Sequence, residues 1–245
     1  MRKILTVLGL ACMLAAGSGL FADEDSKHAV PGVAPEEAWR MLAQGNERFA
    51  GGLVLRPHMD AERLRELSHA QHPWAVVVAA SDSRVVPEII FDQGLGDLFV
   101  LRNAGAIVKT EVEVGSIEYA VEKLGARLIL VLGNSRSDLM KDAVAGGGQD
   151  DKSAAGLMES DLKPALDEAH DKVGGLTGEA LMRESTEKNV LYQIKELLKL
   201  SPVIADKVEA GKVMVVGGVY HLENSRVEWI GEHPSEHDIL EGKKP

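Results

Sequence analysis

The sequence predicts an α/β domain built on a mainly parallel β-sheet, which carries one antiparallel edge strand and is flanked by helices. Continuous apolar runs recur along the chain, and each gives way to a polar or glycine-containing loop, as after Ala80 and Gly133. Unbroken runs of this kind are typical of strands buried on both faces of a parallel sheet. Segments with helical spacing separate the runs, and strands that alternate with helices indicate an α/β architecture.

Two helices are expected before the first strand. Pro35 opens the first, in which apolar residues recur at helical spacing, and Gly45-Asn46 is expected to close it. The second helix is expected at about residues 60–69.

The parallel strands are expected at the apolar runs 74–80, 98–101, 128–133 and 212–217. A crossover helix is predicted at 116–124. Residues 145–154 are rich in Gly, Asp and Ser and are expected to form a surface loop. Residues 227–230 are predicted to pair antiparallel with residues 219–221 at the edge of the sheet. Later helices are expected at 162–170, 186–200 and 203–209.

The first residues have the features of a secretory signal peptide. Arg2 and Lys3 precede an apolar run, and small residues lead to Phe21-Ala22 and an acidic stretch. Cleavage is expected after Ala22, with a periplasmic or secreted product. The apolar run is too short to cross a bilayer comfortably and no later run approaches ~20 apolar residues, so no membrane span is expected. The predicted organisation is a signal peptide at 1–22, an acidic leader at 23–34, one domain at 35–232 and a charged tail at 233–245.

Cys12 is the only cysteine, and it lies inside the predicted signal peptide. After cleavage the protein would contain no thiol, and it could form neither a disulfide nor a zinc–thiolate bond. An alternative makes Cys12 a lipid-anchor site, although Gly9-Leu10-Ala11-Cys12 matches the lipidation motif poorly.

The predicted mature chain is strongly acidic. Residues 1–22 contain two basic and no acidic residues, so 25 Lys and Arg face 38 Asp and Glu, a formal charge of −13. A charge of this sign repels nucleic acid and anionic membranes, so neither is an expected partner. Solubility of an exported protein accounts for the acidity.

Three polar loops are expected at the carboxyl ends of parallel strands, where open α/β sheets bind ligands. The first, with the residue before it, reads Ala80-Ser81-Asp82-Ser83-Arg84 and resembles the CSDSR signature of the β-carbonic anhydrases. Further matches to that family occur in the same order along the chain, at 45–49 (its GNxRF motif), 87–92, 96–105, 115–120 and 201–220. The resemblance covers about residues 35–230 and implies the β-carbonic anhydrase fold.

In that family a zinc ion is held by the Cys of CSDSR and by the His and second Cys of GHSxCG. The resemblance places Ala80, Asn134 and Ser137 at these three positions and Asp138 at the closing glycine. Alanine offers no donor atom, a neutral amide is a weak zinc ligand, and a serine hydroxyl is far harder to deprotonate than a thiol. No zinc cofactor is therefore expected, nor the zinc-bound hydroxide that the family's mechanism needs.

Asp82 and Arg84 match a gating dyad of the family, and without zinc their ion pair is expected to be permanent. A purely structural interpretation is that the pair braces the turn after the strand. The resemblance also gives Arg102, Asn103 and Gly105 a role in loop shape and subunit contact.

Residues 134–138 allow more than one interpretation. Ser135 and Asp138 have the spacing of a helix-capping box in which Ser135 caps. Alternatively, Arg84, Ser135, Arg136 and Ser137 form a small anion site, for which bicarbonate is one candidate.

Three other kinds of site are weighed and disfavoured. The segment 133–137 lacks the closing glycine of G-x-S-x-G, and no histidine has a recognisable triad context, which argues against a serine hydrolase. A rebuilt site from Asp82, Asp138 and His221 would suit a hard cation, but no ligand spacing supports it. His233 and His237 could suggest a metal-binding pair, but both are expected to be solvent-exposed in the charged tail.

The leading hypothesis is an exported, zinc-free homologue that acts as a non-catalytic binding or structural protein. The alternative is a metal-independent carbonic anhydrase, or another small-molecule lyase or hydrolase, that uses the residual polar pocket. The family resemblance also implies a homodimer or a higher even oligomer.

Overall fold

The structure is a computed structural model that describes residues 32–146, 152–172 and 175–242 of the chain. The predicted signal peptide and most of the predicted acidic leader lie outside the described residues.

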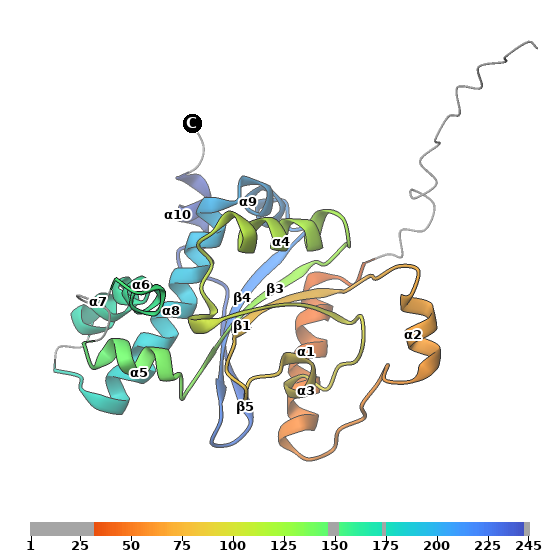
Figure 1. Ribbon diagram of the computed structural model, residues 1–245. Coiled ribbons are helices and arrows are strands. Elements are labelled where there is room, and N and C mark those ends of the chain that lie inside the picture. Colours follow the sequence, from red (N-terminus) through yellow and green to blue (C-terminus); the bar gives the residue numbers. More distant parts are fainter. Residues whose placement is uncertain (1–31, 147–151, 173–174, 243–245) are drawn as a thin grey trace, which may run out of the picture. The chain divides into compact units, whose positions relative to one another are not determined.

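A five-stranded sheet in the order β2-β1-β3-β4-β5 forms the centre of the described domain (Figure 1). The first four strands are parallel, and β5 runs antiparallel to β4, with Tyr220 opposite Val227. The predicted α/β class, the parallel strands and the antiparallel edge pair are therefore confirmed. The strands are β1 (Ala75–Ala80), β2 (Leu98–Asn103), β3 (Leu128–Asn134), β4 (Met214–His221) and β5 (Arg226–Gly231).

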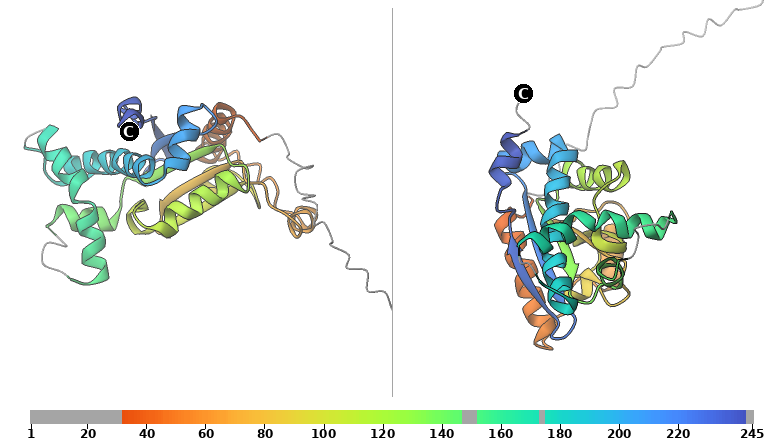
Figure 2. Two further views of the ribbon diagram at one scale, coloured as in Figure 1. Left: turned by 90° about the horizontal axis from the view of Figure 1, so that it is seen from above. Right: turned by 90° about the vertical axis from the view of Figure 1, so that its left-hand side faces the viewer.

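Helices cover both faces of the sheet, and Figure 2 shows α1 and α4 on opposite sides of it. Val76 and Val78 of β1 pack with α4, α8 and α9, whereas their neighbours Ala75 and Val77 pack with α1 and α3. Both faces of the central strands are thus buried, which explains their unbroken apolar runs. The helices are α1 (Pro35–Ala50), α2 (Ala61–Leu67), α3 (Pro87–Ile90), the 3₁₀ turn η2 (Ala104–Ala106), α4 (Glu111–Glu122), α5 (Asp138–Val144), α6 (Ala154–Asp161), α7 (Lys163–Lys172), α8 (Gly178–Leu200), α9 (Pro202–Glu209) and α10 (Glu236–Glu241).

Helix α1 does not end at Gly45-Asn46, as the sequence predicted, but continues to Ala50. A Cβ atom at Gly45 would lie 1.8 Å from the carbonyl oxygen of Phe91, so this glycine permits close packing and does not stop the helix. The buried Asn46 side chain then donates to the carbonyls of Ile90 and Ser225, at 3.2 and 3.0 Å, and accepts from the Val227 N–H at 2.8 Å. These bonds tie α1 to α3 and β5.

Two predicted helices begin earlier than expected. The crossover helix α4 begins at Glu111, because Thr110 and Glu113 form a capping box there. The long helix α8 begins at Gly178, eight residues before the predicted start. The predicted surface loop at 145–154 is only partly tested, since residues 147–151 lie outside the described part, and its last residue already begins α6.

The charged tail was predicted at residues 233–245, of which the structure describes 233–242, and Glu236–Glu241 fold as α10 against α8. Ile239 and Leu240 pack on the cluster formed by α4, α8 and α9, and this apolar contact holds the segment in place. His233 is half-buried, so its predicted exposure is wrong, and this burial lowers its pKa, whereas His237 is exposed. No helix in residues 32–146, 152–172 and 175–242 is long and apolar enough to span a membrane.

Candidate functional site

The three positions that the family resemblance assigns to zinc ligands lie at the carboxyl edge of the sheet. Ala80 is the last residue of β1, and Asn134 is the last residue of the neighbouring β3. Ser137 follows three residues later and is the N-cap of α5. Ala80 and Asn134 are only 5% and 2% exposed. The strands carry both residues into the interior, because β1 is apolar throughout and β3 is apolar up to Gly133, the residue before Asn134.

Each of the three positions now has a structural contact. The Ala80 carbonyl accepts from Arg102 Nε at 3.1 Å, and the Asn134 amide lies 3.5 Å from a carboxylate oxygen of Asp82. Ser137 Oγ accepts from the Met140 N–H at 3.2 Å and so caps α5.

This donor set does not fit zinc. Zinc in proteins is bound by thiolates, imidazoles and carboxylates, and none of the three positions carries one. Among the described residues, no group of three or more His, Cys, Asp and Glu could hold a metal ion. The side chains considered for a rebuilt site have other partners, since Asp82 pairs with Arg84 and His221 Nε2 lies 2.8 Å from Glu228.

Asp82 and Arg84 form the predicted ion pair, with two parallel contacts from the guanidinium to the carboxylate, at 2.9 and 2.6 Å. The Arg84 side-chain hydrogen bonds hold the pKa of Asp82 below its usual range. Arg84 also donates to the Arg136 carbonyl at 2.9 Å, and Arg102 donates to the Asp82 carbonyl at 2.6 Å. The pair, which lies in the loop after β1, is therefore fixed both to the end of β2 and to the loop after β3.

The other residues after β2 shape their own loop. The Asn103 amide group donates to the Ile107 carbonyl and accepts from the Ile107 N–H, both at 2.7 Å. Gly105 has φ of +85°, a conformation that suits glycine. These contacts confirm the predicted role in loop shape, and a role in subunit contact stays a prediction.

The predicted capping role of Ser135 is wrong. Its hydroxyl donates to Glu223 Oε2 at 2.8 Å and accepts from the Leu222 N–H at 3.1 Å, while Ser137 caps the helix. Ser135 thus fastens the loop after β3 to the turn between β4 and β5. The same contacts give it no histidine partner among the described residues, which counts against a serine nucleophile.

Arg136 bridges two carboxylates. Its Nε donates to Glu223 at 2.6 Å and its Nη1 donates to Glu179 at 2.7 Å. The pKa of Glu223 is lowered to about 2, first by the hydrogen bond from its own backbone N–H and then by Ser135 and Arg136.

The predicted anion site therefore differs from expectation. Arg84 and Arg136 come together in one region, but each already faces carboxylates of the chain. A small anion there has to compete with Asp82, Glu179 and Glu223.

Sequence reasoning missed Glu179 and Glu223. The position of Glu223 could have been predicted, because it lies in the turn between the two strands of the predicted antiparallel pair, and this turn lies beside the end of β3. Glu179 could not be placed in this way, since α8 was expected to begin after it.

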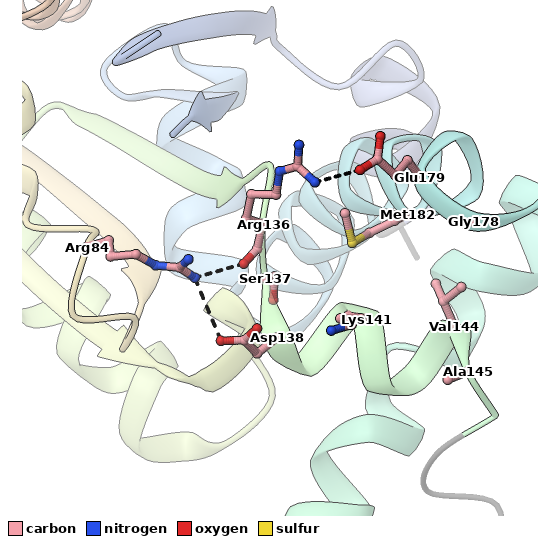
Figure 3. A pocket seen from close by; sticks show the side chains of 10 residues that line it. All are labelled: Arg84, Arg136, Ser137, Asp138, Lys141, Val144, Ala145, Gly178, Glu179 and Met182. Carbon is pink, nitrogen blue, oxygen red and sulfur yellow. Dashed lines mark hydrogen bonds and ion pairs between the residues drawn. The ribbon is translucent and has the colours of Figure 1, made fainter. Parts of the chain in front are cut away.

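A cavity of about 560 Å³ opens beside these loops, between α5 and the start of α8 (Figure 3). Polar side chains line its end near Arg84, and apolar ones line the far end. The lining residues are Arg84, Arg136, Ser137, Asp138, Lys141, Val144, Ala145, Gly178, Glu179 and Met182.

Comparisons with known proteins agree with the fold. A family model described as carbonic anhydrase matches residues 75–227. A carbonic anhydrase of Mycolicibacterium smegmatis is 37% identical over 201 residues, which cover 81% of this chain and 95% of the relative. The β-carbonic anhydrase CcaA is similar in structure, with a TM-score of 0.65 and 28% identity over 79% of this chain and 91% of that one. One of two tetrameric β-carbonic anhydrases of Sordaria macrospora shares the fold, with a TM-score of 0.62 and 24% identity over 79% of this chain and 96% of that one.

Proposed function

The chain belongs to the β-carbonic anhydrase family, and from this membership we propose that it is a zinc-free homologue, unable to hydrate CO₂ through zinc-bound hydroxide. In this proposal it acts as a non-catalytic binding or structural protein.

The observation that carries the proposal is the donor set at Ala80, Asn134 and Ser137. A catalytic zinc site needs three protein ligands that hold the metal and leave one position for water. The methyl group of Ala80 cannot coordinate, and the Ser137 hydroxyl is engaged as the cap of α5. If Cys12 is removed with the signal peptide, no thiolate is left elsewhere in the chain to replace them.

The state of Asp82 supports a non-catalytic role over the metal-independent alternative. A general base works best with a pKa near the working pH. The pKa of Asp82 is instead held low by Arg84, and Arg84 and Arg102 fix both residues in place. A carboxylate in this state is a weak base toward water.

The proposal extends to location and assembly. The basic start and apolar run of residues 1–22 support export to the periplasm or the medium. The tetrameric assembly named for the Sordaria macrospora enzyme supports a homodimer or higher even oligomer. A small anion such as bicarbonate, bound by Arg84, Ser135, Arg136 and Ser137, belongs to the same proposal.

The test uses the mature protein, purified after export, with its cleavage site fixed by intact mass. Metal content is measured by mass spectrometry, and CO₂ hydration by stopped flow, with and without added zinc. The expected result is less than one-tenth equivalent of zinc and no hydration above buffer.

Stoichiometric zinc with rapid hydration would overturn the proposal. Hydration in metal-free protein would favour the alternative, and an Asp82→Asn variant would then show whether that carboxylate takes part.

A further inference from the structure

Two cavities share a wall beside the loop after β3. The larger, of about 560 Å³, lies between α5 and α8, and a second of about 310 Å³ lies toward β4. Arg136, Glu179 and Met182 line both of them. The Arg136–Glu179 ion pair, drawn as a dashed contact in the upper part of Figure 3, therefore lies in the wall that the two cavities share.

The larger cavity has a polar end and an apolar end. Ser137 and Asp138 lie near Arg84, whereas Val144 and Ala145 lie at the far end of α5 (Figure 3). Met182 of α8 faces this space from above, and its side chain is half-buried. An occupant that matches both ends must be amphipathic, because a purely polar one leaves the apolar wall hydrated.

The charges favour a single negative charge on the occupant. Three cationic and two carboxylate side chains line the cavity, a net charge of +1. Within the described residues, the Lys141 ammonium group has no ion pair or hydrogen bond. It lies on α5 between the polar and the apolar residues (Figure 3).

Two further side chains can donate hydrogen bonds to such an anion. Ser137 Oγ accepts a hydrogen bond from the Met140 N–H, which leaves its own proton to donate. The Arg136–Glu179 pair is 45% and 80% exposed in its side chains, so its loss costs little and Arg136 can exchange Glu179 for another carboxylate.

We propose that this cavity binds a small monocarboxylate with a short apolar chain or ring. The carboxylate lies on Lys141, Ser137 and Arg136, and the apolar part lies against Val144, Ala145 and Met182. This inference rests on the proposed binding role and narrows its ligand, since bicarbonate has no apolar group to cover that wall.

Isothermal titration calorimetry of the mature protein with acetate, butyrate, hexanoate and benzoate tests the chain-length effect. Affinity is expected to rise roughly two- to fourfold per methylene group until the apolar end is filled. Bicarbonate and 1-hexanol, which each lack one of the two parts, are expected to bind far more weakly than hexanoate. Equal affinities across the carboxylates, or no binding of any, would overturn the inference.

Variants separate the two ends of the site. Lys141→Gln should weaken all the carboxylates by about tenfold, the size of a charge-assisted hydrogen bond. Met182→Gln should flatten the dependence on chain length, and Glu179→Gln should strengthen binding because it removes the competing carboxylate. Lys199→Gln is the matched control, since Lys199 is an exposed lysine at the other end of α8.

Thermal unfolding of each variant confirms that it is folded, and Lys141 and Glu179 are exposed enough to be replaced without loss of the core. Unchanged binding in folded Lys141→Gln would refute the site. Stoichiometric zinc and CO₂ hydration in the wild type would instead refute the proposed function. The carboxylate titration would still decide whether the cavity binds a monocarboxylate.

Discussion

Replacing Ala80 by Cys, Asn134 by His and Ser137 by Cys introduces the family's ligand types at the three positions that the resemblance assigns to zinc ligands. The change tests whether the scaffold still holds these positions in zinc-binding geometry. Two of them end neighbouring parallel strands and the third caps α5, so the backbone is fixed by the sheet and by the Asp82–Arg84 network. We expect the triple variant to bind zinc.

The expected loss of stability in the metal-free variant follows from the contacts that the three substitutions remove or crowd. Ser137→Cys removes an N-cap, which costs about 1 kcal/mol. Larger side chains at Ala80 and Asn134, which are 5% and 2% exposed, crowd a packed region and cost about 1–2 kcal/mol more. In a chain of this size each kcal/mol changes Tm by about 2–4 °C, so the metal-free variant should melt roughly 4–12 °C below the wild type.

Zinc binding is expected to reverse this loss of stability. Saturation at a thousand times Kd stabilises a protein by about 4 kcal/mol, so the zinc-bound variant should melt about 8–16 °C above its metal-free form. The assay is scanning calorimetry with zinc and with a chelator, and thiolate absorption after cobalt substitution reports the ligands. A double variant that retains Ala80 is the control, and its shift should be much smaller. A triple variant that folds yet shows no zinc-dependent shift refutes the view that the loops keep the family geometry.

Three other predictions concern the stability of the scaffold and the assembly of the protein. Asn46→Ala should lower the free energy of unfolding in urea by about 2–3 kcal/mol, because two buried backbone groups and one half-buried one lose their partner, whereas Glu47→Ala on the exposed side of α1 should have little effect. Glu223→Gln should destabilise the protein at pH 7 by at most about 1 kcal/mol, since the carboxylate is 45% exposed and its interactions are screened. Because the pKa of Glu223 is lowered to about 2, its contribution is present above the unfolded-state value of about 4.3 and is lost as pH falls through about 2, so a difference that persists below pH 2 would contradict the assignment. Sedimentation at micromolar concentration should give at least a dimer mass, and a monomer would contradict the proposed assembly.

The sheet could be predicted from the sequence because its central strands are buried on both faces. Val76 and Ala75 point to opposite sides yet both are apolar, so the run itself marks the strand. The end of α1 could not be predicted in the same way. Gly45 has the chemistry of a helix stop, and only the position of the Phe91 carbonyl shows that it permits close packing.

The candidate site was predictable in position but not in its contacts. Ser135 and Ser137 both have the chemistry of an N-cap, and the choice between them depends on Glu223, which lies 88 residues from Ser135. Helix α10 was missed for a related reason, since Ile239 and Leu240 are too few to give a helical pattern without the surface of α8.

The Arg136 bridge also has a consequence for the order of folding. Arg136 is 43 positions from Glu179 and 87 from Glu223, so the bridge requires α8 and the β4–β5 turn to be in place. Contacts of such long range close large loops, so the bridge should form after the transition state, with a low φ-value. Its loss should then speed unfolding and leave the folding rate nearly unchanged. The bridge would thus add modestly to how long the native state persists, an effect that matters for the exported protein that we propose, because it folds beyond the reach of cytoplasmic chaperones.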